Sequence, residues 1–160
     1  MIYQLNQKFF SLTDKYQILD ADKQVAYQVD GQFFSLGKTL HLYDANDALL
    51  ATIKQKLLAF RPTFYVHFSN GVTMKVMKMF TPIFKSRFMA YLGEQQITIV
   101  GDFLSHEFTL SDGEQVLAQV SKAWASLTDH YALEVEQQLA PVAICILVII
   151  DAVHHSGQSS

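Results

Sequence analysis

Three residues in the segment "GDFLSHEF" have types that acid–base chemistry uses, because Asp102, His106 and Glu107 follow one another closely. A carboxylate that orients an imidazole is a common arrangement for proton transfer. In one extended strand, however, Asp102 and His106 would lie about 13 Å apart at roughly 3.3 Å per residue, and Glu107 would face away from His106. We therefore predict no catalytic residues and expect a protein that is not an enzyme.

The other reactive residue types form no recognisable motif. The six histidines are scattered, and no Cys/His spacing is typical of zinc. The sequence also has no phosphate-cradling glycine loop, no nucleophile elbow and no acidic loop like that of an EF-hand. We predict no metal site and no cofactor.

Two single residues, Cys145 and Trp124, are interpreted as packing residues. Cys145 lies within "APVAICILVII", where a thiol behaves as a small buried hydrophobe. A single cysteine cannot form an intramolecular disulfide, which favours a reducing cytoplasm. Trp124 has a large apolar area to bury and is expected in the core or at its mouth.

The strongest chemical signal is a separation of charge along the chain. Residues 48 to 93 contain seven basic and no acidic residues, so this segment carries +7 and the rest −10, which sums to the net −3. Such asymmetry indicates an anionic partner. Alternatively, these side chains are solvated and pair with acids on adjacent strands. The predicted anion-binding residues are Lys54, Lys56, Lys75, Lys78, Lys85 and Arg87.

Period-two geometry makes a finer prediction about these basic residues. Lys54 and Lys56 would share one face of a strand, whereas Lys75 and Lys78 would not unless a bulge intervenes.

An internal repeat indicates how the elements that carry these residues are built. Short apolar boxes recur at a spacing of twenty-four residues, at 9–12, 33–36 and 57–60, and a looser echo lies at 123–127. Each is followed by an alternating apolar and polar run, a turn cluster and a second alternating run, which is the pattern of a β-hairpin. We interpret each unit as a hairpin plus a connecting box, and the repeated unit as the device from which a β-wall is made. The expected turns are 20–23, 44–47, 69–71 and 111–113.

The hairpins are followed by one apolar helix candidate, whose most apolar stretch is 139–153. As a helix this stretch would reach only about 22 Å, short of the roughly 30 Å bilayer core, and it contains Asp151. We therefore predict no transmembrane segment. Asp151 is expected to reach the barrel mouth and to bond main-chain amides or a lysine.

About a dozen strands precede this helix, and closure would remove their exposed edges. The predicted fold is mainly β (α+β), a closed barrel of about twelve mostly antiparallel strands that encloses a central hydrophobic C-terminal helix. Residues 1–155 would form a single domain with its core helix at about 138–154, and 156–160 a flexible tail.

Several motifs in order resemble those of one family. "GQFFSLG", "KQKLLAF", "GDFLSHEFTL" and the final Asp151-Ala152-Val153 are similar to the LURP-one-related family of the Tubby-like superfamily. The resemblance implies a twelve-stranded barrel around a hydrophobic helix, a fold shared with phospholipid scramblases. It also implies proximity to membranes, since Tubby domains bind phosphoinositide headgroups. No Tubby phosphoinositide motif can be matched residue by residue, so no binding residue is transferred.

These observations lead to two functional hypotheses. The first is a non-enzymatic cytoplasmic binding module, peripheral at the inner membrane face, that recognises an anionic surface such as phospholipid headgroups. The alternative is a protein–protein interaction scaffold without lipid binding. Nucleic acid ranks below both, because aromatic residues on a basic groove cannot be distinguished from barrel packing. The N-terminus lacks the features of a signal peptide, in agreement with a cytoplasmic protein.

Overall fold

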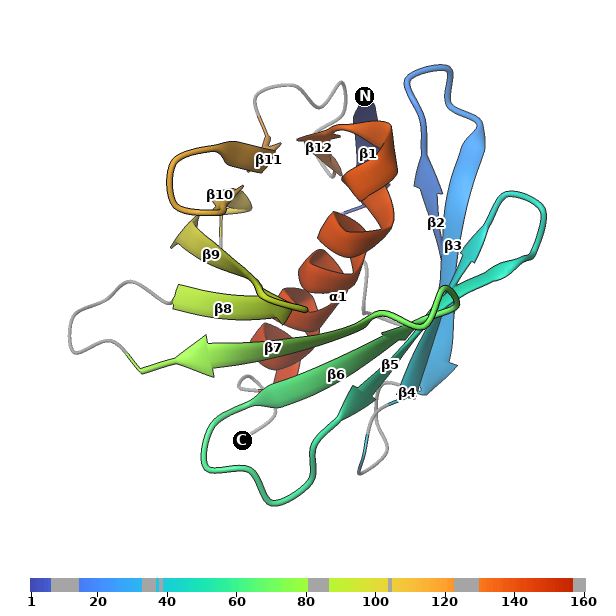
Figure 1. Ribbon diagram of the computed structural model, residues 1–160. Helices are drawn as coiled ribbons and strands as arrows, with labels where there is room; N and C mark the ends of the chain where they lie inside the picture. Colours follow the sequence, from blue (N-terminus) through green and yellow to red (C-terminus); the bar gives the residue numbers. More distant parts are fainter. Residues whose placement is uncertain are drawn as a thin grey trace.

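The computed structural model describes residues 1–6, 15–32, 37, 39–80, 87–103, 105–122 and 130–156. Its strands pair antiparallel with their neighbours and close into a barrel in which β1 pairs with both β2 and β12 (Figure 1). The predicted fold is thereby confirmed. The strands are β1 (Ile2–Asn6), β2 (Lys15–Leu19), β3 (Val25–Gln32), β4 (Thr39–Asp44), β5 (Leu49–Gln55), β6 (Thr63–Phe68), β7 (Thr73–Met79), β8 (Arg87–Leu92), β9 (Gln95–Asp102), β10 (Glu107–Ser111), β11 (Val116–Ser121) and β12 (His130–Val135).

Alternating side chains fill the barrel from its wall. In β4, for example, Leu40 and Leu42 are fully buried, whereas His41 and Tyr43 between and beyond them are not. Successive side chains of a strand point to opposite faces, so each strand contributes every second residue to the interior. The alternation of apolar and polar residues in the sequence predicted these strands for the same reason.

The predicted hairpin turns are present and are held by local side chains. Asp20 accepts two backbone N–H groups with Oδ1, both at 2.9 Å, and Asp44 makes the equivalent pair of bonds in the next hairpin. Gly71 and Gly113 adopt φ angles of 90° and 96°, which disfavour residues with a Cβ. These turns connect β2 to β3, β4 to β5, β6 to β7 and β10 to β11.

One helix runs through the barrel (Figure 1). A 3₁₀ turn, η1 (Gln137–Leu139), leads into α1 (Ala140–Ser156), which extends slightly beyond the predicted end. Every residue from Ala143 to Val153 is buried, so the helix meets the wall on all sides. By length and composition the stretch Gln137–His154 could cross a membrane, but 67% of it is buried in the protein.

All odd-numbered strands end at the same end of the barrel, because consecutive strands alternate in direction. Helix α1 enters after β12 at the opposite end and therefore terminates at this one, which is also the end that holds the connection between β5 and β6. We call it the box end, because the apolar box 57–60 lies in that connection.

The box 57–60 is the one copy that the structure describes, and it connects two hairpins, as the repeat predicts. Residues Leu57–Phe60 belong to no strand, and Leu57, Leu58 and Phe60 are exposed. The hairpins alone make the wall, and this box is an exposed connection. The copies at 9–12, 33–36 and 123–127, with Trp124, lie outside the described residues, as does most of the predicted tail.

Candidate functional site

Two of the predicted basic residues, Lys54 and Lys75, lie in one row across the outside of the barrel. Lys54 of β5 is the Cα partner of Tyr65 in β6. On the other side of Tyr65, its Cα partner in β7 is Lys75, and the Cα partner of Lys75 in β8 is Tyr91. Lysine and tyrosine therefore alternate over four adjacent strands. Neighbouring strands are about 4.8 Å apart, so the two lysines start roughly 10 Å from each other.

The other described basic residues of the segment 48–93 lie toward the box end of the same strands. Lys56 follows β5 and donates its backbone N–H to Thr63 at 2.9 Å, which places it one step beyond the Lys54 row. Lys78 donates its backbone N–H to the carbonyl of Pro62 at 3.0 Å, and Pro62 lies at the end of the connection that Lys56 begins. Lys54 and Lys56 are both exposed, as period two predicts.

Two arginines complete this cluster: Arg61 lies just before β6, and Arg87 begins β8. The Arg61 guanidinium Nη1 lies 3.3 Å from the Met79 sulfur, and Met79 is the Cα partner of Arg87. Arg61 was part of the basic segment but not among the predicted binding residues. These cations lie on β5, β7 and β8 and in the connection between β5 and β6, and we call them the basic face: Lys54, Lys56, Arg61, Lys75, Lys78 and Arg87.

Lys75 and Lys78 point to opposite sides of the wall, as predicted for a strand without a bulge. The pairing of β7 continues without a register shift, and Lys78 lies opposite the buried Phe88. Lys78 is therefore on the interior side, at the mouth of the barrel. The sixth predicted residue, Lys85, lies outside the described residues.

Across the described ranges, no member of the basic face forms an ion pair. The described residues on adjacent strands therefore include no acid that pairs with these cations. The segment 48–93 contains no acid that could pair with them locally.

The segment around Asp102 is not one extended strand, so the reason given against a catalytic pair was wrong. Asp102 ends β9 and is the Cα partner of Glu107, which begins β10. Ser105 donates its backbone N–H to Asp102 Oδ1 at 3.2 Å within this turn. The Glu107 carboxylate accepts the backbone N–H of Lys122 at 2.9 Å. Asp102 and Glu107 therefore hold the backbone of neighbouring elements together.

His106 instead meets Asp151 of α1, a contact that sequence reasoning missed. Its Nε2 lies 3.7 Å from Asp151 Oδ1, and its ring stacks on Tyr131 with centroids 4.3 Å apart. Tyr131 donates its hydroxyl to Asp151 Oδ2 at 3.0 Å. The expected partners of Asp151, main-chain amides or a lysine, are thus replaced by a phenol and an imidazole. An aspartate in an apolar helix requires a polar partner, which was the available signal.

Burial dominates the electrostatics of this interior cluster. It raises the pKa of Asp151 from 3.8 to about 7, although the hydrogen bond from Tyr131 acts in the opposite direction. Burial and the nearby carboxylate raise the pKa values of Tyr131 and Tyr16 well above 10, so both phenols stay protonated. The cluster can therefore hold one proton near neutral pH on the interior side of the wall.

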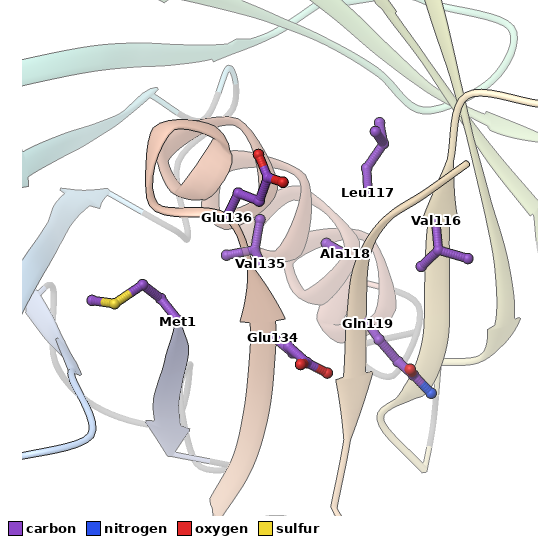
Figure 2. A pocket seen from close by; sticks show the side chains of 8 residues that line it. All are labelled: Met1, Val116, Leu117, Ala118, Gln119, Glu134, Val135 and Glu136. Atoms are coloured by element: carbon purple, nitrogen blue, oxygen red, sulfur yellow. The ribbon is translucent and has the colours of Figure 1, made fainter.

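An open hollow of about 250 Å³ lies at the end of the barrel opposite the box end. It is lined by Met1 and by residues of β11 and β12, with Glu134 opposite Gln119 and Glu136 above them (Figure 2). Two carboxylates and no lysine or arginine side chain line it, so its side chains do not favour an anion. No group of three His, Cys, Asp or Glu residues within the described ranges could hold a metal ion.

A closed antiparallel β-barrel with a hydrophobic helix inside defines the class of this protein. Within that class, the chain belongs to the LURP-one-related family, whose model matches residues 1–151. The family resemblance seen in the sequence is thereby confirmed. No curated protein and no solved structure matches the chain.

Proposed function

We propose that the protein is a non-enzymatic, cytoplasmic binding module that attaches to anionic phospholipid surfaces through the basic face. The observation that carries the proposal is the gathering of six cations on β5, β7, β8 and the connection between β5 and β6, which form no ion pair with any other described residue. Near an anionic leaflet each lysine or arginine contributes about 1 kcal/mol, so several acting together suffice for reversible attachment.

The family supports the proposal at the level of fold. The chain has the barrel architecture of the LURP-one-related family, which resembles that of Tubby domains and scramblases. The tyrosines between the lysines add a second supporting feature, because tyrosine is favoured at membrane–water interfaces.

Vesicle flotation tests the proposal directly. The purified protein is mixed with vesicles of phosphatidylcholine alone or with 30% phosphatidylserine, each at low and at high salt. We expect flotation only with the anionic vesicles, and its loss at high salt, because screening weakens exposed charges. Absence of binding to anionic vesicles at low salt would refute the proposal.

Single charge neutralisations give the matched comparison. Lys54→Gln and Lys75→Gln should each lower the apparent affinity about fivefold, which corresponds to roughly 1 kcal/mol. Lys23→Gln is the control, because Lys23 is exposed in the turn between β2 and β3, outside the basic face. An equal loss in the control would indicate a response to net charge rather than to this surface.

A further inference from the structure

Large apolar side chains are exposed together at the box end. Leu58 is 104% exposed relative to a free residue, Phe60 89%, Phe80 61% and Leu57 57%. Scattered exposed hydrophobics are normal, but a contiguous group indicates an interaction site. We call these four residues the apolar tip.

The apolar tip joins two different connections of the barrel. Phe60 lies between β5 and β6, and Phe80 directly follows β7. Their rings meet edge to face with centroids 5.8 Å apart. The Arg61 guanidinium lies 5.6 Å from the centre of the Phe80 ring and ties the tip to the basic face. The tip is therefore one surface with a cation at its base.

Leu58 gains nothing from the protein that surrounds it. Its side chain is fully exposed, and its φ angle of 56° is in the left-handed region, which asparagine and glycine adopt more readily than leucine. Neither packing nor backbone preference therefore accounts for a leucine at this position. An apolar medium outside the protein would account for it.

The cations are arranged behind the apolar tip, toward the barrel. Lys56 and Arg61 flank the box, while Lys78 and Arg87 lie on the neighbouring strands β7 and β8. A lipid surface has the complementary order, with apolar chains beneath anionic headgroups. A second copy of this chain lacks this order, because the cations behind the two apolar tips would face each other and repel.

We infer that the apolar tip inserts into the acyl region of an anionic bilayer while Lys56, Arg61, Lys78 and Arg87 bind the headgroups. The inference rests on the proposed function and deepens it: the ligand is a bilayer whose acyl region takes up the tip, in addition to the headgroup charge that a soluble anion also offers. The box end then faces the membrane, and the hollow at the other end of the barrel faces away from it.

Site-specific labelling tests the insertion. Cys145 is fully buried in α1, so in Leu58→Cys an environment-sensitive dye will react at the tip. Val116→Cys is the matched control, since Val116 is 65% exposed at the opposite end of the barrel. With vesicles containing 30% phosphatidylserine, the dye at position 58 should shift its emission to the blue and be quenched by lipid-borne quenchers. The dye at position 116 should do neither.

A second pair of variants separates insertion from folding. Leu58→Asn suits the left-handed backbone and so preserves the fold, while Phe60→Ser removes a ring that lies in solvent. Each should weaken binding to anionic vesicles by about tenfold, the usual effect of keeping one such side chain out of an apolar phase. Binding of inositol hexakisphosphate, a soluble polyanion, should be unchanged in both.

The outcomes distinguish the inference from the proposed function. If the unmodified protein floats with anionic vesicles but the dye at position 58 remains in water, the inference is wrong and the proposed function stands. If the protein does not bind anionic vesicles at all, both are wrong. A stable dimer that Leu58→Asn dissociates would identify the tip as a self-association surface and would also overturn the inference.

Discussion

Asp151 makes folding stability depend on pH. Its carboxyl titrates near 3.8 when unfolded and at about 7 when buried beside Tyr131 and His106. Between these values the folded protein binds the proton more tightly than the unfolded chain, so this contribution is complete below about pH 4 and is lost as pH rises through 7. Asp151→Asn should therefore be more stable than the parent at pH 8 and nearly equal to it at pH 4.

Urea unfolding at several pH values measures this effect, which should amount to a few kcal/mol because each pKa unit corresponds to about 1.4 kcal/mol. Tyr131→Phe is the companion variant: it removes the hydroxyl that stabilises the ionised carboxylate and should steepen the loss of stability with pH. A parent that gains stability relative to Asp151→Asn from pH 5 to pH 8 would mean that an ion pair with His106 outweighs burial.

Cys145 should be chemically silent in the folded protein. It is fully buried, and burial raises the pKa of its thiol far above neutrality, which leaves almost no thiolate to react. A thiol reagent should label it only in denaturant, as monitored by mass spectrometry. Rapid labelling of the native protein would show that α1 leaves the barrel under native conditions.

At the scale of elements, two glycines allow adjacent strands to approach closely near the box end. A Cβ at Gly101 of β9 would overlap the Glu107 carbonyl and Phe108 of β10, and one at Gly31 of β3 would overlap the Thr39 carbonyl of β4. Their φ angles of 154° and 155° also disfavour other residues. These glycines allow the backbones of the paired strands to lie in close contact.

Gly101→Ala should consequently destabilise the protein by roughly 1–3 kcal/mol more than Gly113→Ala, the range typical of an overpacked site. Gly113 is the matched control because its φ is also positive, at 96°, but nothing would lie within 4 Å of an added Cβ. Thermal unfolding compares the two variants. Equal losses would mean that β9 and β10 separate easily and that the close approach is not constrained.

Sequence patterns revealed the elements whose signals are local and missed those that depend on distant partners. The turn at Asp44 was predictable because its side chain bonds the backbone within the same turn. The meeting of Asp151 with His106 joins residues far apart in the chain, and no local pattern encodes it. The gathering of the basic residues was predictable because consecutive hairpins pack side by side. The exposure of Leu58 was not, since apolar residues are generally expected in the core.

For the molecule as a whole, stability and binding belong to different regions. The interior, packed around Ile146 and its neighbours on α1, is buried on all sides, whereas the basic face and the apolar tip lie outside or at the rim. Because the barrel is filled by its own helix, the box end can carry exposed apolar residues without a loss of core packing.

Paired substitutions should separate the two regions. Ile146→Ala removes a fully buried side chain from the centre of the barrel and should lower the free energy of unfolding by about 2–5 kcal/mol, because the closed wall cannot collapse around the cavity. Leu58→Asn should leave that free energy unchanged or higher, because the side chain contributes no burial and asparagine suits its φ of 56°. Urea unfolding of both variants, beside flotation with anionic vesicles, is the measurement. While Ile146→Ala remains folded it should bind vesicles like the parent, whereas Leu58→Asn should lose affinity. A variant that lost both properties together would show that the core and the box end are coupled, contrary to a rigid barrel that displays an independent surface.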